Sequence, residues 1–307
     1  MNPAISVIIP VYNGEKWITN TLKNLSKQSF RDFEVIIIND GSTDKTKSLV
    51  EVFCKEDQRF EFFNKPNGGV SSARNMGIAK ASGKYIIHHD ADDKMPKDAL
   101  ASLYECAETN QVDIVGGDFV IQWKGQDYRK VQDFSSNTEE FIQGLLDNHY
   151  HGSLCNKLIK SEVCEGITFE KKINIQEDLL YLIRVLLRKP KVRYLPEIVY
   201  YYKRREDSIS QSKSSNVLWD QKKVIELLQD EFKKRNIKFN LDRLKCGYKF
   251  KTIILQEDIN HKEVYREVNN RIFQVNMNIK AKVILYFESK GIHLFSKIFL
   301  YLRELKN

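Results

Sequence analysis

The segment Tyr85-Ile86-Ile87-His88-His89-Asp90-Ala91-Asp92-Asp93 places three carboxylates directly behind an apolar run. An apolar run that ends in clustered acids is typical of a buried strand that delivers negative charge to a sheet edge. Such carboxylates repel one another unless a cation lies among them. Mg²⁺ and Mn²⁺ take oxygen ligands from one or two carboxylates together with phosphates, so the segment is a candidate metal and diphosphate site. The alternative is a solvated acidic turn before the helix that Met95-Pro96 introduces.

Strand and helix patterns alternate before this segment. The expected strands are Ile5–Pro10, Phe33–Ile38, Phe60–Phe63 and Tyr85–Ile87. The expected helices are Trp17–Leu25, a segment from Thr43-Asp44 through Phe53, and Val70–Ala81. This alternation predicts parallel βαβ units, and therefore an α/β fold with a mixed, mainly parallel sheet and helices on both faces.

Each of the four strands ends in a polar cluster. The clusters are Tyr12-Asn13, Asn39 to Ser42, Asn64 to Asn67, and Asp90 to Asp93. Open α/β sheets bind ligands at the carboxyl ends of their strands, so the four clusters are expected to converge on one edge. No GxGxxG and no GxxxxGK[ST] occurs, which argues against a dinucleotide-binding domain and a P-loop.

The pattern loosens after Asp93. Further helices are expected at Ala99–Glu108, Glu139–Leu146 and Gln176–Leu187. Further strands are expected at Val112–Val115, at Phe119–Trp123 as an antiparallel edge strand, and at Val192–Tyr202. Only helical patterns follow Val217, and the Ser-rich stretch Ser208–Ser215 is the candidate boundary. The sequence thus predicts a sheet domain over residues 1–212 and a basic, mostly helical region over residues 213–307.

Charge and cysteine content restrict the setting. The net charge is +8, and residues 201–307 hold 23 Lys and Arg against 13 Asp and Glu. This basic rear suits an anionic surface or substrate, and no recognised nucleic-acid-reading motif is present. Five scattered cysteines indicate reduced thiols and a cytoplasmic protein. Neither a signal peptide nor a run of about 18 apolar residues is evident, so no spanning helix is expected.

Four motifs carry a resemblance to a known family. They are Ser6 to Asn13, Asp40 to Asp44, Asn67 to Asn75, and Asp90 to Asp93, and their order and spacing resemble a family 2 glycosyltransferase of the GT-A fold. The resemblance extends through Cys155 to Leu158, Glu177-Asp178, and Tyr202 to Ser210. It covers roughly residues 4–212, and the tail has no comparable match.

The resemblance implies a metal-dependent, inverting transfer of a hexose or N-acetylhexosamine from a UDP-sugar to a hydroxyl group. The expected acceptor is a lipid-linked glycan of the bacterial capsule or exopolysaccharide type, reached by a cytoplasmic enzyme at the inner face of the cell membrane. The expected cofactor is Mn²⁺ or Mg²⁺. Oligomerisation is left open.

The resemblance also implies nucleotide-binding residues. Asp40 corresponds to the aspartate that contacts uracil, and Pro10 with Tyr12 would form the wall under the base. The alternatives are a turn residue for Asp40 and core packing for Pro10 and Tyr12. Gly68-Gly69 would let the backbone approach a ligand closely and leave N–H groups free at the start of the next helix, which makes an anion site. Asn67, just before them in the same motif, is also a candidate nucleotide-binding residue.

Arg74 lies one turn further and is expected near the nucleotide, although a surface ion pair is the alternative. Asp90 and Asp92 match the family's D-x-D, which assigns Asp92 as the metal ligand, with Asp90 beside it near the ribose. Asp93 is left as a possible cap. His88 and His89 stand where relatives carry apolar residues, and we interpret them as packing residues rather than as ligands.

An inverting transfer needs a general base opposite the leaving group. Glu177-Asp178 open an apolar helix whose dipole favours ionised acids. The family's matching base is the second acid, Asp178, with Glu177 as the second candidate; two favourable first-turn charges are the alternative. Lys203 and Arg204, followed by Arg205, would clamp the diphosphate or form a solvated loop. Lys157 lies in a matching motif without an assigned role.

The tail segment Ala281–Leu305 alternates apolar blocks with Lys and Arg, and Gly291 is expected to break it into two pieces. Such a pattern fits a helix in a membrane interface, and equally a helix packed on its own core or on a second subunit.

Two rival functions remain at this stage. A sugar-nucleotide nucleotidyltransferase would carry a Gly-rich basic loop where Tyr12-Asn13-Gly14-Glu15 stands. The other rival is a non-catalytic nucleotide-binding scaffold.

Overall fold

The computed structural model describes residues 2–205, 215–257 and 259–304. The chain divides into two compact units, one of Met1–Ile142 with His151–Ile209 and one of Gln143–Tyr150 with Ser210–Asn307. Residues 143–150 therefore group with the C-terminal helices although they lie within the sheet-forming part of the sequence. The domain division after residue 212 stays a prediction, and Ser208–Ser215 lies almost entirely outside the described residues.

The first unit is built on a mixed sheet, with β3-β2-β1-β4-β7-β5-β6 in that order and β8 paired to β5. The strands are β1 (Ile5–Val11), β2 (Phe33–Asp40), β3 (Phe60–Lys65), β4 (Tyr85–His88), β5 (Ile114–Trp123), β6 (Gln126–Lys130), β7 (Lys157–Lys160) and β8 (Val192–Lys203). Neighbours among β1 to β4 pair parallel, as does β8 with β5, whereas β7 and β6 pair antiparallel. The predicted α/β class with a mainly parallel sheet is confirmed.

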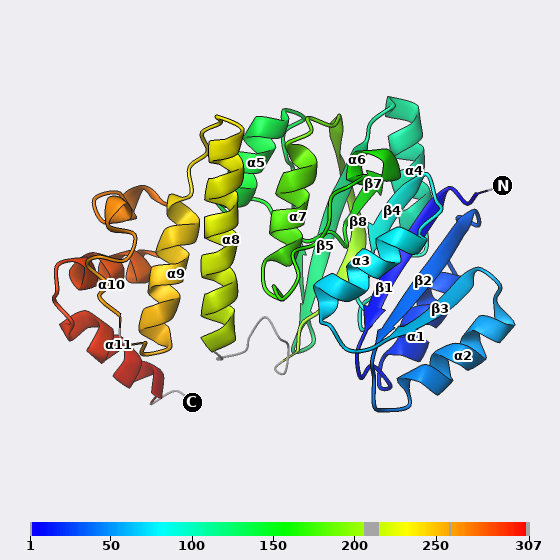
Figure 1. The fold of residues 1–307 in the computed structure, drawn as a ribbon, viewed down its shortest axis with the longest axis horizontal. Helices are drawn as coiled ribbons and strands as arrows, with labels where there is room; N and C mark the ends of the chain where they lie inside the picture. The colour runs from blue at the N-terminus through cyan, green and yellow to red at the C-terminus, as the bar shows by residue number, and fades with distance from the viewer. Residues whose placement is uncertain (1, 206–214, 258, 305–307) are drawn as a thin grey trace. The chain divides into compact units, whose positions relative to one another are not determined.

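Helices cover both faces of this sheet. They are α1 (Ile18–Ser26), α2 (Thr46–Glu56), α3 (Val70–Lys80), α4 (Ala99–Asn110), α5 (Thr138–Leu146), α6 (Ser161–Cys164) and α7 (Glu177–Leu186). Successive strand residues point to opposite faces, so both faces of β1 and β2 need apolar side chains. Val7 and Val35 share one core with α1, α2 and α4, whereas Ile36 packs with α3 on the other face (Figure 1).

Close contact between α3 and β1 depends on a glycine. A Cβ atom added at Gly77 would lie 2.3 Å from Cγ2 of Ile8. The helix can therefore approach the strand only because position 77 lacks a side chain. Arg74 lies one turn earlier on the same helix, so this contact also determines how close Arg74 lies to the sheet.

Two predictions about the middle of the chain are wrong. The segments predicted as two strands, Val112–Val115 and Phe119–Trp123, are replaced by one strand, β5 (Ile114–Trp123), which pairs with β6 and β7 on one side and β8 on the other. The second segment is therefore no edge strand. Gly116 and Gly117, between the two predicted segments, are buried inside the strand, where Phe134 and Val199 leave no space for a Cβ atom. The short strands β6 and β7 were not predicted.

The second unit is helical in the residues described, as the pattern after Val217 predicts. Its elements are α8 (Ser215–Lys234), α9 (Asp242–Ile254), the 3-10 turns η2 (Arg266–Val268) and η3 (Ile272–Gln274), α10 (Ile279–Ser289) and α11 (Leu294–Glu304). Gly291 adopts φ +78° between the last two helices, so the predicted break is confirmed. Within residues 2–205, 215–257 and 259–304, every helix is too short or too polar to cross a bilayer.

Candidate active site

The carboxyl ends of the parallel strands carry the predicted site residues. β1 lies between β2 and β4 in the sheet, so the segments after all three strands meet at one edge. α7 adds a further pair of acids there, because Arg74 of α3 reaches both Asp90 and the start of α7. The predicted convergence of the clusters is therefore present in the fold.

Asp40, at the end of β2, is buried and organises the loop before α3. Its carboxylate accepts hydrogen bonds from the backbone N–H groups of Gly68 (2.9 Å) and Gly69 (2.8 Å) and pairs with Lys65. The side-chain amide of Asn67 donates to the Asp40 carbonyl at 2.9 Å. The expectation that these N–H groups are free is therefore wrong, because Asp40 accepts both. Contact between Asp40 or this loop and a nucleotide stays a prediction.

The acidic turn after β4 separates into three different environments. The side chain of Asp90 is 37% exposed and contacts Arg74 at 3.2 Å. Asp92 is 17% exposed and pairs at 2.9 Å with Arg205, whose guanidinium also stacks on the Trp17 ring. Guanidinium groups thus supply the positive charge that the clustered acids require. Burial raises the pKa of Asp92, and the neighbouring Asp90 raises it further.

Asp93 is buried and joins the acidic turn to β8. It accepts hydrogen bonds from the Tyr200 hydroxyl (2.8 Å) and from the Lys203 backbone N–H (2.8 Å). The same Tyr200 oxygen accepts a hydrogen bond from the Asp90 N–H at 3.1 Å. Burial raises the pKa of Asp93 well above its ordinary value. Asp93 is therefore a positioning residue for the turn, and α4 begins beyond it at Ala99.

Arg74 connects the acidic turn with the acids of α7. Its side chain is 3% exposed, and its Nη1 lies 2.7 Å from Glu177 Oε1 and 2.5 Å from Asp178 Oδ1, while Nη2 lies 3.2 Å from Asp90. The three carboxylates hold the Arg74 pKa well above its ordinary value against the opposing effect of burial. The alternative of a surface ion pair is thus excluded, because this guanidinium is buried among three acids.

The two acids of α7 differ in their electrostatic state. Burial and the neighbouring Asp178 raise the pKa of Glu177 to about 8, so near neutral pH this carboxyl holds a proton. Burial also raises the pKa of Asp178, but Arg74 and a hydrogen bond from the Leu154 N–H oppose the rise. Asp178 is also the more exposed, at 18% against 11% for Glu177. Of the two, Asp178 is better placed to receive a proton from an incoming group.

Lys157 has a structural position that the sequence alone did not indicate. Its side chain is fully buried, and its ammonium donates to the carbonyls of His151 (3.0 Å) and Ser153 (2.7 Å) and to Asn156 Oδ1 (2.9 Å). Desolvation lowers the Lys157 pKa to about 7, although Asp178 opposes the change. Lys157 therefore holds in place the loop whose Leu154 N–H bonds Asp178.

The two histidines before the turn are both buried. His88 lies edge-on to Phe169 and Tyr181, and His89 lies edge-on to Tyr200. Burial lowers the pKa of both, to about 4 for His89, so neither carries a positive charge at neutral pH. These positions agree with the interpretation of packing residues.

The remaining nucleotide candidates lie at the rim. Tyr12 is 55% exposed after β1, and Pro10 is partly buried within that strand. Lys203 and Arg204 are exposed at the end of β8, and the Arg204 guanidinium lies 4.9 Å from the centre of the Trp123 ring. All four lie at the edge of the sheet where the parallel strands end, and their contact with a nucleotide stays a prediction. Ser208 to Ser210 of the same motif lies outside the described residues.

The carboxylate oxygens of the acidic turn are ligands of the kind that a divalent metal ion prefers. No group of three or more His, Cys, Asp or Glu arranged to hold a metal occurs among the described residues. Mg²⁺ and Mn²⁺ do not need one when a diphosphate supplies further oxygens, since one or two carboxylates then suffice. Asp92 and Asp90 are both carboxylates, and their mutual repulsion is relieved by any cation between them. They are the residues that would hold the ion.

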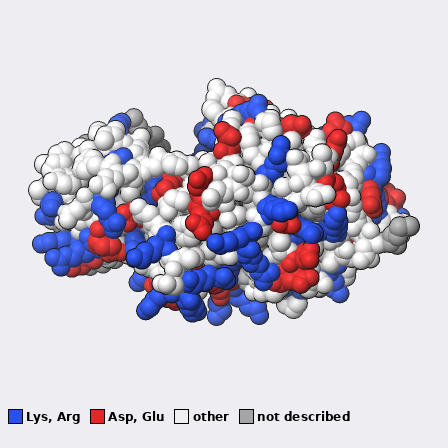
Figure 2. Space-filling view, turned by 90° about the horizontal axis from the view of Figure 1, so that it is seen from above, with Lys and Arg blue, Asp and Glu red and all other residues white. Residues whose placement is uncertain are grey.

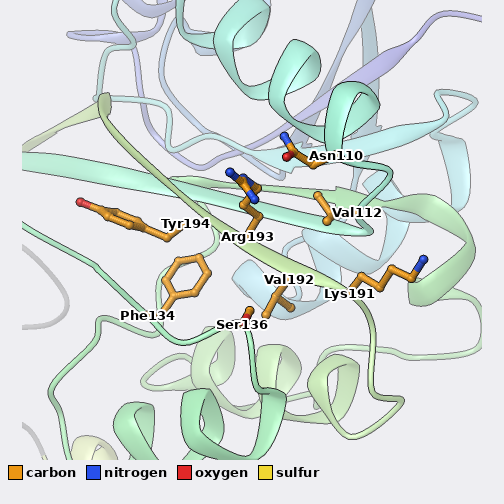
Figure 3. A pocket seen from close by; sticks show the side chains of 8 residues that line it. All are labelled: Asn110, Val112, Phe134, Ser136, Lys191, Val192, Arg193 and Tyr194. Atoms are coloured by element: carbon orange, nitrogen blue, oxygen red, sulfur yellow. The ribbon is translucent and has the colours of Figure 1, made fainter.

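A separate pocket of about 500 Å³ lies away from this edge. Figure 3 shows the side chains that line it, among them Lys191 just before β8, Arg193 at the start of β8, Asn110 at the end of α4, and Phe134. The acidic turn faces the opposite end of β8, near Tyr200 and Lys203. This pocket therefore plays no part in the arrangement described above.

The chain matches known proteins over most of its length. The family model of glycosyl transferase family 2 matches residues 6–168. A curated relative, the uncharacterized glycosyltransferase EpsJ of Bacillus subtilis, is 30% identical over 221 residues, which are 69% of this chain and 64% of EpsJ. This chain thus spans less than two thirds of that relative.

Solved structures share the fold at lower identity. TarS residues 1–349 of S. aureus in complex with UDP-GlcNAc align with a TM-score of 0.69 and 18% identity over all of this chain and 93% of that one. The mannosyltransferase PcManGT of Pyrobaculum calidifontis, in complex with GDP-Man and Mn²⁺, aligns with a TM-score of 0.58 and 14% identity over 99% and 85% of the two chains. The fold is the GT-A fold, and the chain belongs to glycosyl transferase family 2.

Proposed function

We propose that this protein is a metal-dependent, inverting glycosyltransferase that moves a hexose or N-acetylhexosamine from a UDP-sugar to an acceptor hydroxyl. The observation that carries the proposal is the buried Arg74, which joins the acidic turn at Asp90 to the acids of α7. One side chain thus separates the residues suited to a sugar nucleotide from a candidate base. A direct transfer requires the donor site and the base to lie close together, and a single side chain contacts both here.

The donor half of the proposed site lies over β1, β2 and β4. Tyr12 is exposed and offers a ring on which a base can stack, and Pro10 at the end of β1 and Asp40 at the end of the neighbouring β2 would contact the same base. Asp92 and Asp90 would bind Mn²⁺ or Mg²⁺, which would neutralise the charge that develops on the departing nucleoside diphosphate. Support for this part comes from the UDP-GlcNAc and GDP-Man with Mn²⁺ in the similar structures.

The acceptor half of the proposed site is centred on Asp178. Asp178 accepts the proton of the attacking hydroxyl while the sugar's bond to the diphosphate breaks on the opposite face. Arg74 keeps this carboxylate ionised and in place, and the loop held by Lys157 supports it from the other side. Glu177 is the second candidate, but its raised pKa makes it a poorer proton acceptor near neutral pH. Lys203 and Arg204 are placed to contact the diphosphate.

The proposed acceptor is a lipid-linked precursor of a surface glycan, which places the enzyme in the cytoplasm at the inner face of the membrane. The basic residues 201–307 support this setting, because Lys and Arg are attracted to an anionic leaflet. We propose no nucleic-acid partner. The division into a catalytic domain over residues 1–212 and a helical region over residues 213–307 is part of the same proposal.

A donor screen tests the function directly. Purified full-length protein is incubated with UDP-hexoses and UDP-N-acetylhexosamines and a polyprenyl-linked acceptor, with Mn²⁺ or with EDTA, and UDP release is recorded. We expect release with at least one donor in Mn²⁺ and none in EDTA. Titration calorimetry with UDP and Mn²⁺ separates the rivals, because a scaffold without a metal site would bind UDP equally well in EDTA. A nucleotidyltransferase would instead release pyrophosphate from UTP and a sugar phosphate.

A further inference from the structure

The last helix, α11, carries a set of apolar side chains that are exposed in the described unit. This surface, the α11 stripe, consists of Leu294, Phe295, Ile298, Tyr301 and Leu302, with Ile292 just before the helix. The exposed fractions reach 60% at Leu294 and 62% at Tyr301. Scattered exposed apolar residues are ordinary, but a contiguous set on one helix marks an interaction surface.

The helix is held with its apolar side outward. Ser296, on the opposite side of α11, is buried and donates a hydrogen bond to Glu288 of α10. His293 lies 2.7 Å from the same carboxylate, and Phe299 packs against the core of the unit. The residues at 294, 298, 301 and 302 follow the helical spacing of one face. The polar anchor therefore fixes the direction in which the stripe faces.

Basic side chains surround the α11 stripe. Lys290 and Lys297 are exposed at its edges, and residues 271–303 contain six Lys and Arg against one acid, the buried Glu288. Figure 2, a view from above in which the α11 stripe is not marked, shows Lys and Arg side chains along the lower edge of the C-terminal unit at the left. Apolar side chains flanked by Lys are complementary to a bilayer interface, where acyl chains lie beneath anionic head groups.

The length of the helix decides how it meets a bilayer. The 11 residues of α11 extend over about 16 Å, roughly half of the hydrocarbon thickness. The helix cannot span the membrane, but its stripe can enter the boundary between head groups and acyl chains while Ser296 stays with the protein.

A second copy of the chain fits this surface less well. Stable protein interfaces use about 20 to 30 residues on each side, whereas the stripe offers six. A two-fold contact would also bring the same basic flank of each copy, including Lys297, against its equivalent. Both the small size and the like charge favour a lipid surface.

We propose that the α11 stripe, with Lys290 and Lys297, is a membrane-docking surface that inserts into the interface of an anionic lipid bilayer. This deepens the membrane part of the proposed function and rests on it only for the idea that the acceptor is lipid-linked. Docking itself requires neither donor nor catalysis, so the two can fail separately.

Sedimentation of the full-length protein with lipid vesicles tests the proposal. The vesicles contain phosphatidylcholine with or without phosphatidylglycerol. We expect binding to the anionic vesicles, weakened by salt. The triple variant Leu294→Ser/Ile298→Ser/Leu302→Ser should lower the partition coefficient about ten-fold or more, because three apolar side chains no longer leave water. Lys290→Gln/Lys297→Gln should lower it about ten-fold on anionic vesicles only.

The matched control is Val52→Ser/Tyr128→Ser/Val131→Ser, which removes three exposed apolar residues from the first unit. It should bind vesicles like the wild type. Wild-type protein that stays in the supernatant, or a stripe variant that binds normally, overturns the proposal. So does a stripe variant that changes only the mass measured by light scattering, since the stripe would then belong to a second copy. Calorimetry with UDP and Mn²⁺ on the same samples reports separately on the catalytic proposal.

Discussion

At the scale of single residues, one cation can serve several acids, and the structure shows which acids share it. Arg74 contacts Asp90, Glu177 and Asp178, while Arg205 pairs with Asp92. Burial and the neighbouring Asp178 raise the pKa of Glu177 more than Arg74 lowers it. Because of these different partners, we expect Asp92 to bind a metal ion and Asp178 to accept a proton.

The role of Asp92 can be isolated by an isosteric change. Asp92→Asn removes a charged oxygen and should abolish Mn²⁺-dependent UDP binding, measured by titration calorimetry. Asp98→Asn is the matched control, because Asp98 is exposed before α4 and its side chain makes no capping hydrogen bond. Equal UDP affinity in wild type and Asp92→Asn would remove the metal role.

The role of Asp178 predicts a pH dependence. Asp178→Asn should keep UDP affinity within a few-fold and lower the transfer rate about 10²- to 10⁴-fold, because no base receives the hydroxyl proton. In the wild type, burial raises the Asp178 pKa above 3.8, and only the ionised form accepts a proton. Transfer at constant donor should therefore rise with pH through a pKa above that value and then level off.

Glu177→Gln is the control for this experiment. Because Glu177 is already protonated near neutral pH, its amide variant should retain most of the transfer rate. If Glu177→Gln lost transfer while Asp178→Asn kept it, the two acids would have to exchange roles.

At the scale of elements, the site depends on strands that are distant in the sequence. The turn after β4 is attached to β8 through Tyr200, whose hydroxyl donates to Asp93 and accepts from the Asp90 N–H. Backbone hydrogen bonds between Lys94 and Tyr201 continue the same junction. The acidic turn is thus held by a strand more than one hundred residues later.

Removing one hydroxyl tests this junction. Tyr200→Phe leaves the buried Asp93 without one donor and should lower the free energy of unfolding by about 1–3 kcal/mol, measured in urea. It should also weaken Mn²⁺-dependent UDP binding, because the Asp90 N–H loses its acceptor. Tyr194→Phe is the matched control on β8, since its hydroxyl donates to the buried Asp118 at 2.8 Å. A similar loss of UDP affinity in both variants would argue against a specific role of the junction.

At the scale of the whole molecule, the second compact unit includes a segment that interrupts the first in sequence. Gln143 exchanges hydrogen bonds with the Asn240 backbone (3.1 and 2.9 Å), and the Asn276 side chain donates to the Asp147 carbonyl. The C-terminal part of α5 therefore has partners that come after residue 212.

Truncation after residue 212 separates folding from binding. The fragment should bind UDP and Mn²⁺ within a few-fold of the full chain, because every proposed nucleotide contact lies before residue 205. It should unfold at a lower temperature and exchange amide hydrogens faster in residues 143–150, which lose their partners. The β1 and β2 amides serve as the internal control. A well-folded fragment without UDP affinity would contradict the proposed domain division.

The local sequence pattern was enough to predict those elements that are long and either continuously apolar or clearly periodic. The strands β1 to β4, their helices and the polar residues after each strand are readable because buried parallel strands are continuous apolar runs. The helical tail could be predicted from its helical periodicity. The break at Gly291 could be predicted because glycine readily adopts the positive φ found there. The resemblance of the motifs also indicated the family and the candidate residues.

Tertiary structure alone decided which charges meet. The four residues of β7 and the wholly exposed β6 carry too little apolar pattern to be recognised, and Gly116-Gly117 concealed the continuity of β5. The occupation of the Gly68 and Gly69 N–H groups by Asp40, the burial of Lys157 and the three partners of Arg74 all join residues from separate elements. A side chain's ionisation depends on its distance to such neighbours and to water, and only the folded chain sets these distances.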